Sequence, residues 1–227
     1  MGNRILKPLL LPASVALLWL ISGWGYAALL ASGNSGIPMG LAAVVSPDTM
    51  PVRIRSMLDG PGLVLVAGLS ALPVAALALA LLPGAKTGRQ PRGTLFLASW
   101  MSMVLAAVAG SAVLAVGGIL AMLPFAQVQW TFDMLAPALL TGAYWGVSWG
   151  WLPALLAVFL RASADDGGRS PAEQPTSGRQ RTGALGASVL FSAALLVALP
   201  LAADYPQPAP VSEAVLTPEP AVYGVPD

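Results

Sequence analysis

Few side chains in this sequence could act as acids, bases, nucleophiles or metal ligands. The 227 residues include no cysteine and no histidine, which excludes disulfides, thiolate nucleophiles and Cys/His metal sites. The acids Asp48, Asp59 and Asp133 accompany Arg53 and Arg55, but their spacing forms no recognisable catalytic constellation. We therefore predict that the chain is not an enzyme and holds no metal or cofactor.

Hydroxyl and aromatic side chains are concentrated in one segment, TGAYWGVSWGWLP. Thr141, Tyr144 and Ser148 share one face of a helix there, where they either line a small polar cleft or bond to a neighbouring backbone. Trp145 and Trp149 form a ridge beside them, suited to a lipid or quinone tail or to packing against protein. Tyr144, Trp145 and Trp149 are therefore candidate contacts with a partner or with lipid.

The composition indicates that these residues lie in a membrane protein. The chain is 56% hydrophobic and 9% charged, whereas soluble domains carry about 25% charged residues. Five stretches lack Asp, Glu, Lys, Arg, Asn and Gln, and each exceeds the roughly 18 residues that suggest a membrane-spanning helix. None alternates with the period of a barrel strand. The sequence therefore predicts an all-α integral membrane domain, residues 1–203, with spans at 9–31, 62–83, 94–123, 134–160 and 183–203.

The first predicted span follows Arg4 and Lys7, as the apolar part of a secretory signal does. Its uninterrupted apolar run covers residues 9–31, whereas a signal peptide has an apolar region of about 7–15 residues. We therefore expect this segment to be a retained membrane helix.

The distribution of Lys and Arg predicts the orientation. Nine of the eleven cations lie in the N-terminus, residues 84–93 and residues 161–182, while Arg53 and Arg55 are on the opposite side. Because cytoplasmic loops are enriched in Lys and Arg, we expect a cytoplasmic N-terminus and an external C-terminus. The prevalence of Arg, Ala, Gly, Leu and Pro is typical of a high-GC bacterium, which favours the bacterial inner membrane.

Three segments outside the spans have distinct compositions. Residues 46–60 (SPDTMPVRIRSMLDG) predict a short helix, capped by Asp48 or Thr49, that either lies flat on the bilayer or docks on another subunit. Arg53 and Arg55 would face water, headgroups or that partner. Residues 162–182 are rich in Gly, Ser, Pro and charge, which predicts a flexible cytoplasmic linker.

The last segment, residues 204–227, contains six prolines and four acids but no cation. Such a composition predicts an extended external tail, partly polyproline II. The tail is either disordered or lies along a partner, in which case Tyr205 is a candidate contact.

Small residues predict close helix packing. Gly142, Gly146 and Gly150 recur at intervals of four in span 134–160, a pattern that lets two backbones approach closely in a membrane. Residues 124–133 form a short connection to span 94–123, which predicts an antiparallel hairpin. A helix of another chain is the other possible partner for the glycines. The small-residue row of span 94–123 consists of Ala107, Ser111, Ala115 and Gly118.

Two further residues lie inside predicted spans. Trp19 is near the middle of the first span, where an indole is expected to pack against another helix rather than at a membrane interface. Pro73 removes one backbone hydrogen bond from the second span and predicts a kink.

The absence of charge from the spans argues against an ion-coupled carrier, because such proteins place ionisable residues inside the membrane. Net charge is +1, so no basic face indicates nucleic acid. We predict a non-catalytic accessory or scaffold subunit of a larger bacterial membrane complex, in contact with lipid and with other membrane subunits. The alternative is a permease subunit of an ATP-driven exporter for lipid or hydrophobic peptide.

Overall fold

The computed structural model describes residues 3–31, 39–58, 60–83, 91–122, 128–165 and 178–203. These residues are almost entirely helical and form no strand; Leu58 and Ala203 make one isolated antiparallel bridge. The predicted tail at 204–227, with Tyr205, and the central part of the predicted linker lie outside the described residues. The helices in chain order are α1 (Asn3–Ala31), α2 (Met39–Val45), α3 (Val52–Arg55), α4 (Gly60–Leu81), α5 (Arg92–Met122), α6 (Val128–Ser148), α7 (Trp151–Asp165) and α8 (Gly178–Ala202).

Four helices are long and apolar enough to cross a membrane, which is consistent with a multi-pass membrane protein. They correspond to four of the five predicted spans. A fifth candidate is the pair of segments Asp133–Ser148 and Trp151–Ala162, which meet at a bend of 45°. The candidate spans are Leu9–Ala31, Gly60–Leu81, Arg92–Met122 and Thr182–Ala202.

The stretch predicted as one helix at 134–160 is therefore two helices, α6 and α7. Gly150 lies in the turn between them, and Pro153 follows in the first turn of α7. Because Pro153 has no N–H, it cannot donate to the carbonyl of Trp149 in a continuous helix. That carbonyl instead accepts from the backbone N–H of Leu152 at 3.1 Å. In α4, by contrast, the helix continues through Pro73.

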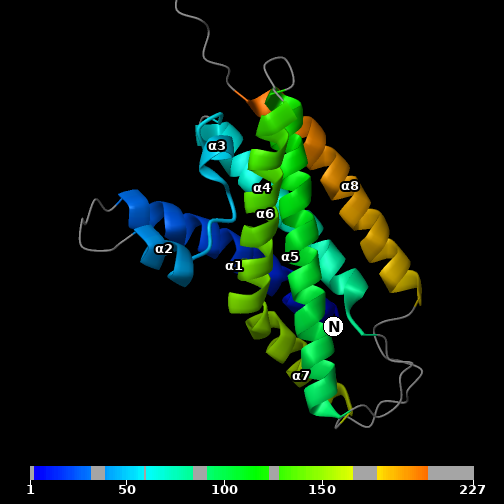
Figure 1. The fold of residues 1–227 in the computed structure, drawn as a ribbon. Coiled ribbons are helices and arrows are strands. Elements are labelled where there is room, and N and C mark those ends of the chain that lie inside the picture. The colour runs from blue at the N-terminus through cyan, green and yellow to red at the C-terminus, as the bar shows by residue number, and fades with distance from the viewer. Residues whose placement is uncertain are drawn as a thin grey trace, which may run out of the picture.

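In Figure 1, α5 and α6 run alongside each other, α4 and α8 run alongside each other at a slant to that pair, and α1 crosses them obliquely. α5 is central and packs against α4, α6, α7 and α8. Short α3 lies where α4 and α6 begin and where α5 and α8 end (Figure 1), and we call this the α3 end of the bundle. The bridge between Leu58 and Ala203 joins the start of α4 to the end of α8 there.

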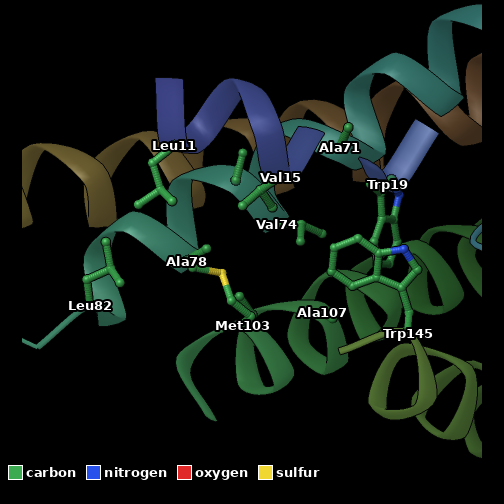
Figure 2. Close-up of a cluster of buried hydrophobic side chains, with 12 residues drawn as sticks. Leu11, Val15, Trp19, Ala71, Val74, Ala78, Leu82, Met103, Ala107 and Trp145 are labelled. Carbon is green, nitrogen blue, oxygen red and sulfur yellow. The ribbon is translucent and has the colours of Figure 1, made fainter. Parts of the chain in front are cut away.

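Two buried apolar clusters hold the helices together. The first surrounds Trp19, Val74, Met103 and Trp145, where α1, α4, α5 and the end of α6 meet (Figure 2). The second, nearer the α3 end, surrounds Ile54 and joins α3 to α4, α5, α6 and α8. The fully buried side chains of this second cluster include Ile54, Val66, Leu195 and Leu199.

Residues 46–60 differ from the single interfacial or docking helix that the sequence predicted. In the described part of this range the structure forms α3, α4 begins at Gly60, and α2 precedes the range. Met50, Ile54 and Leu58 recur at intervals of four and are all buried in the second cluster. The apolar side of this segment is therefore covered by apolar side chains of α4, α5, α6 and α8.

Candidate functional site

The glycine row of α6 lies against α5. A Cβ added at Gly142 would be 2.7 Å from the carbonyl oxygen of Ala107 and 2.9 Å from the Cβ of Ser111. A Cβ at Gly146 would be 2.5 Å from the Cα of Val104. Real Cβ atoms do not approach other atoms so closely, so these positions admit no side chain without a shift of α6. Gly150 belongs to the break, where an added Cβ would meet the Gly146 carbonyl and Met103.

The small-residue row of α5 meets more than one neighbour. Ala107 and Ser111 lie against α6, as described above. Gly118 instead lies against Ile54 and Met134, with an added Cβ 3.2 Å and 3.0 Å from their side chains. Ala115 is buried and lines a cleft. At the Gly118 end the row therefore meets Ile54 of α3 as well as Met134 of α6.

Trp145 corrects one expectation, because it presents no surface to lipid or to a partner. Its side chain is 0% exposed and meets Trp19 edge to face, with ring centroids 5.1 Å apart (Figure 2). Trp19 donates its Nε1–H to Ser70 Oγ at 3.2 Å. Trp145 Nε1 makes no hydrogen bond within the described chain. The oblique course of α1 brings Trp19 onto the end of α6, and Trp145 is buried among Trp19 and residues of α4 and α5.

Tyr144 and Trp149 bind the end of α2. The Tyr144 hydroxyl donates to the Val44 carbonyl at 3.0 Å, and the Trp149 Nε1–H donates to the Val45 carbonyl at 3.2 Å. Carbonyls in the last turn of a helix have no partner within that helix, so these two side chains satisfy them. Tyr144 thus fills both roles that its sequence allowed, because it bonds to a neighbouring backbone and also lines the cleft described below. The Ser148 hydroxyl likewise donates to a backbone carbonyl, that of Tyr144 in its own helix.

The residues after α2 are held against α1. Ser46 Oγ donates to the Ser22 carbonyl at 2.7 Å, and Ser22 Oγ donates to the Pro47 carbonyl at 2.8 Å. Thr49 Oγ1 donates to the Trp19 carbonyl at 3.0 Å. These groups are buried and paired, as polar groups removed from water must be. Thr49 is consequently engaged with α1 rather than serving as the cap of the predicted helix.

An ion pair links two residues of the segment that follows α2. Arg55 Nη2 lies 2.6 Å from Asp48 Oδ1 and donates to the Met50 carbonyl at 2.9 Å. The Met50 N–H donates to the same Asp48 oxygen at 3.1 Å, and the Arg55 guanidinium lies over the Tyr26 ring. Burial raises the pKa of Asp48 to about 6, against the lowering effect of Arg55. Arg55 is thus bound within the chain, and the side chain of Arg53 lies outside the described part.

Backbone carbonyls at the break between α6 and α7 also accept hydrogen bonds from neighbouring groups. The Gly146 carbonyl accepts from Trp100 Nε1 at 3.0 Å and from the Gly150 N–H at 3.1 Å. The Ser148 carbonyl accepts from Trp151 Nε1 at 2.8 Å. Broken helices of transporters expose such carbonyls to coordinate ions. Here the indoles of Trp100 and Trp151 donate to two of these carbonyls, those of Gly146 and Ser148.

A cleft of about 550 Å³ lies between α6 and residues 43–54. This volume falls in the range of ligand sites in proteins. Its walls are mainly apolar, and two carboxyl groups, two phenols and one hydroxyl interrupt them. Those polar lining residues are Tyr26, Asp48, Asp133, Thr141 and Tyr144; the apolar ones are Ala43, Pro47, Pro51, Ile54, Ala115, Met134, Pro137, Ala138 and Leu140.

The sequence allowed a small polar cleft lined by Thr141, Tyr144 and Ser148. Thr141 and Tyr144 do line this cleft, whereas Ser148 is not among its lining residues, and the wall formed by residues 43–54 was not predicted. A second cavity, of about 350 Å³, lies between α1 and α4 and is lined by Trp19, Ser70 and Arg55 among others. The Asp48–Arg55 pair therefore stands between the two cavities. The sequence signal for this ion pair is an acid and a base seven residues apart, Asp48 and Arg55.

No group of three or more His, Cys, Asp or Glu side chains in the described ranges could hold a metal ion. Comparison of the chain with protein families, with curated proteins and with solved structures finds no match in any of the three.

Proposed function

We propose that the chain is a non-catalytic accessory or scaffold subunit of a larger membrane protein complex in a bacterial inner membrane. The observation that carries the proposal is the open side of α8. Only 17% of the most apolar stretch of α8 is buried within the chain, whereas 56% is buried for α4. The exposed apolar side chains of this side, which we call the α8 outer face, include Leu185, Val189, Leu190, Val197 and Leu201.

The α8 outer face has the geometry that membrane helices use to associate. A Cβ added at Gly183 or Gly186 would meet nothing within 4 Å. Small residues on an open face allow a second backbone to approach closely, and van der Waals packing of this kind drives association in lipid. The glycines of α6 cannot serve this purpose, because α5 already covers them.

The same proposal includes the orientation of the chain across the membrane. The N-terminus is cytoplasmic and the C-terminus external, in agreement with nine of eleven cations on the N-terminal side and with the positive-inside rule. The proposal includes the proline-rich tail at 204–227, which follows the end of α8 and would contact the same partner.

The test is purification from the native membrane in mild detergent, followed by native mass spectrometry. A stoichiometric membrane partner is expected with the wild-type chain. Gly186→Leu should release it, because the added side chain separates the two helices. Gly68→Leu is the matched control, since a Cβ at Gly68 also meets nothing within 4 Å but lies on α4. A chain that purifies alone, or a complex that tolerates Gly186→Leu, would refute the proposal.

The cleft favours a second candidate, a permease subunit of an ATP-driven exporter for lipid or hydrophobic peptide. Its largely apolar lining suits such a substrate, and the charge-free spans require no coupling ion. This candidate predicts co-purification with a cytoplasmic ATPase whose turnover changes when lipid or hydrophobic peptide is added. Retention of a membrane partner without any ATPase would favour the scaffold.

A further inference from the structure

We propose that the cleft between α6 and residues 43–54 binds an amphiphile with an apolar chain and a primary ammonium head. The apolar chain would lie along α6, and the ammonium would donate to Asp48. This inference concerns a ligand of the chain itself, and it stands whether or not the chain is a subunit of a complex.

The shape of the cleft fits an elongated apolar group. Its α6 wall extends from Asp133 to Tyr144, a length of about 16 Å at 1.5 Å per residue. Between these ends the wall consists of Met134, Pro137, Ala138 and Leu140, with Thr141 as the polar exception. The opposite wall is supplied by residues 43–54 and is also apolar apart from Asp48. Burial of an alkyl chain here is favoured by the hydrophobic effect wherever water would otherwise fill the cleft.

The charged residues that line the cleft favour a cationic ligand. Asp48 and Asp133 line it, and none of the described lining residues is a Lys or Arg. The guanidinium of Arg55 belongs to the cavity on the other side of the 48–55 segment. The cleft thus offers two carboxyl groups to a ligand. The nearest described cation, Arg55, is paired with Asp48 and lines the other cavity.

Within the described residues, the hydrogen bonds of Asp48 leave its Oδ2 for a second cation. The Met50 N–H and Arg55 Nη2 both bond to Oδ1, so the ligand ammonium would bond to Oδ2. Burial raises the pKa of Asp48 to about 6 even with Arg55 beside it, so a second cation at this carboxyl would favour its charged form. Tyr26 and Tyr144 also line the cleft, and phenol rings attract an adjacent ammonium. Because Arg55 already lies over the Tyr26 ring, Tyr144 is the stronger candidate for that contact.

The experiment uses the whole chain in phosphatidylcholine nanodiscs with two photo-reactive probes, dodecylamine and dodecanol, each carrying a diazirine at the chain end. Peptide mass spectrometry then locates the labelled residues. The amine probe should label residues 43–54 and the α6 wall of the cleft at least about tenfold more than the alcohol, because only the amine forms a charge-assisted hydrogen bond. Equal labelling by the two probes, or amine labelling spread over the exposed sides of α1 and α8, would overturn the proposal.

Asp48→Asn tests the proposed ammonium partner. It preserves the size of the side chain and should reduce labelling by the amine about tenfold while leaving labelling by the alcohol unchanged. Asp165→Asn, the same change at the end of α7, is the matched control and should alter neither. Undiminished amine labelling of a folded Asp48→Asn protein would contradict the assignment. If that variant does not fold, the amine-to-alcohol ratio of the wild-type chain decides the question.

The ligand chemistry has two possible sources, and a competition experiment distinguishes them. Phosphatidylethanolamine carries a primary ammonium, whereas phosphatidylcholine does not. Loss of amine labelling in nanodiscs that contain phosphatidylethanolamine would identify a membrane lipid as the occupant. Persistence of labelling there would identify an amphiphilic amine that enters from outside the lipid pool.

Discussion

The indoles of Trp19 and Trp145 meet edge to face, with their centroids 5.1 Å apart and their planes inclined by 65°. Both side chains are buried, yet their polar atoms differ. Trp19 Nε1 is bonded to Ser70, whereas Trp145 Nε1 has no hydrogen bond in the described chain. This contact fixes α1 against the end of α6, next to the break that leads into α7 (Figure 2).

Trp145→Phe should change the free energy of unfolding by less than about 1 kcal/mol, because it removes some apolar surface together with an unsatisfied donor. Trp145→Ala should lower the free energy of unfolding by roughly 3–5 kcal/mol through the cavity it leaves. Unfolding of the purified chain in mixed detergent–SDS micelles measures both.

Trp19→Phe is the matched comparison for this pair. It should be more destabilising than Trp145→Phe by roughly 0.5–1.5 kcal/mol, since it breaks the hydrogen bond to Ser70. Equal costs for the two phenylalanine variants would show that the hydrogen bond contributes nothing measurable.

Gly146→Ala should lower the free energy of unfolding by roughly 1–3 kcal/mol, the usual cost of overpacking. The added methyl would meet the Cα of Val104, a backbone atom that cannot move without shifting α5. Gly68→Ala serves as control, because its methyl would meet nothing within 4 Å, and it should change stability by less than about 1 kcal/mol. The same micelle titration applies, and a neutral Gly146→Ala would contradict the close approach of α6 to α5.

Stability should depend on pH through Asp48. Its pKa is about 6 in the folded protein against 3.8 ordinarily, so between these values the folded state binds more protons than the unfolded state. The free energy of unfolding therefore falls as the pH rises from about 4 to 6, by roughly 1–3 kcal/mol in total. Urea or SDS unfolding across this range measures the slope.

Asp48→Asn is the control for the pH effect, because its amide does not titrate. This variant should lose the slope between about pH 4 and 6 while keeping whatever dependence other groups contribute. A wild-type protein that becomes more stable as the pH rises through this window would exclude a raised pKa at Asp48.

Tyr144→Phe and Trp149→Phe should loosen α2. Each removes one donor to the carbonyls of Val44 or Val45, and a lost hydrogen bond of this kind corresponds to about fivefold to tenfold faster local opening. Hydrogen–deuterium exchange of the peptide spanning residues 39–46 reports that opening.

Trp151→Phe provides the control for these two variants. Trp151 donates to the Ser148 carbonyl beside the helix break and does not contact α2 through a described hydrogen bond. Its replacement should leave exchange in residues 39–46 unchanged. If all three variants accelerate exchange there to the same extent, α2 is held by the general packing of α6 and not by the two donors.

The sequence by itself determined the helices. Spans at 9–31, 62–83, 94–123 and 183–203 follow from uncharged apolar runs, because a backbone in lipid must satisfy its own hydrogen bonds. The central position of Trp19 likewise predicted the helix contact that the structure contains. These properties are local: each depends on the residues of one segment and on the solvent around it.

Tertiary structure decided which surfaces meet. The spacing of Gly142 and Gly146 predicts a close contact but cannot name the partner, because any small-residue face would serve; the fold assigns them to α5. Trp145 and Trp149 are neighbours on one ridge in sequence, yet only Trp145 is buried by α1. The cleft and the Asp48–Arg55 pair exist because residues 43–54 return against α1 and α6, a path set by hydrogen bonds between segments far apart in the chain.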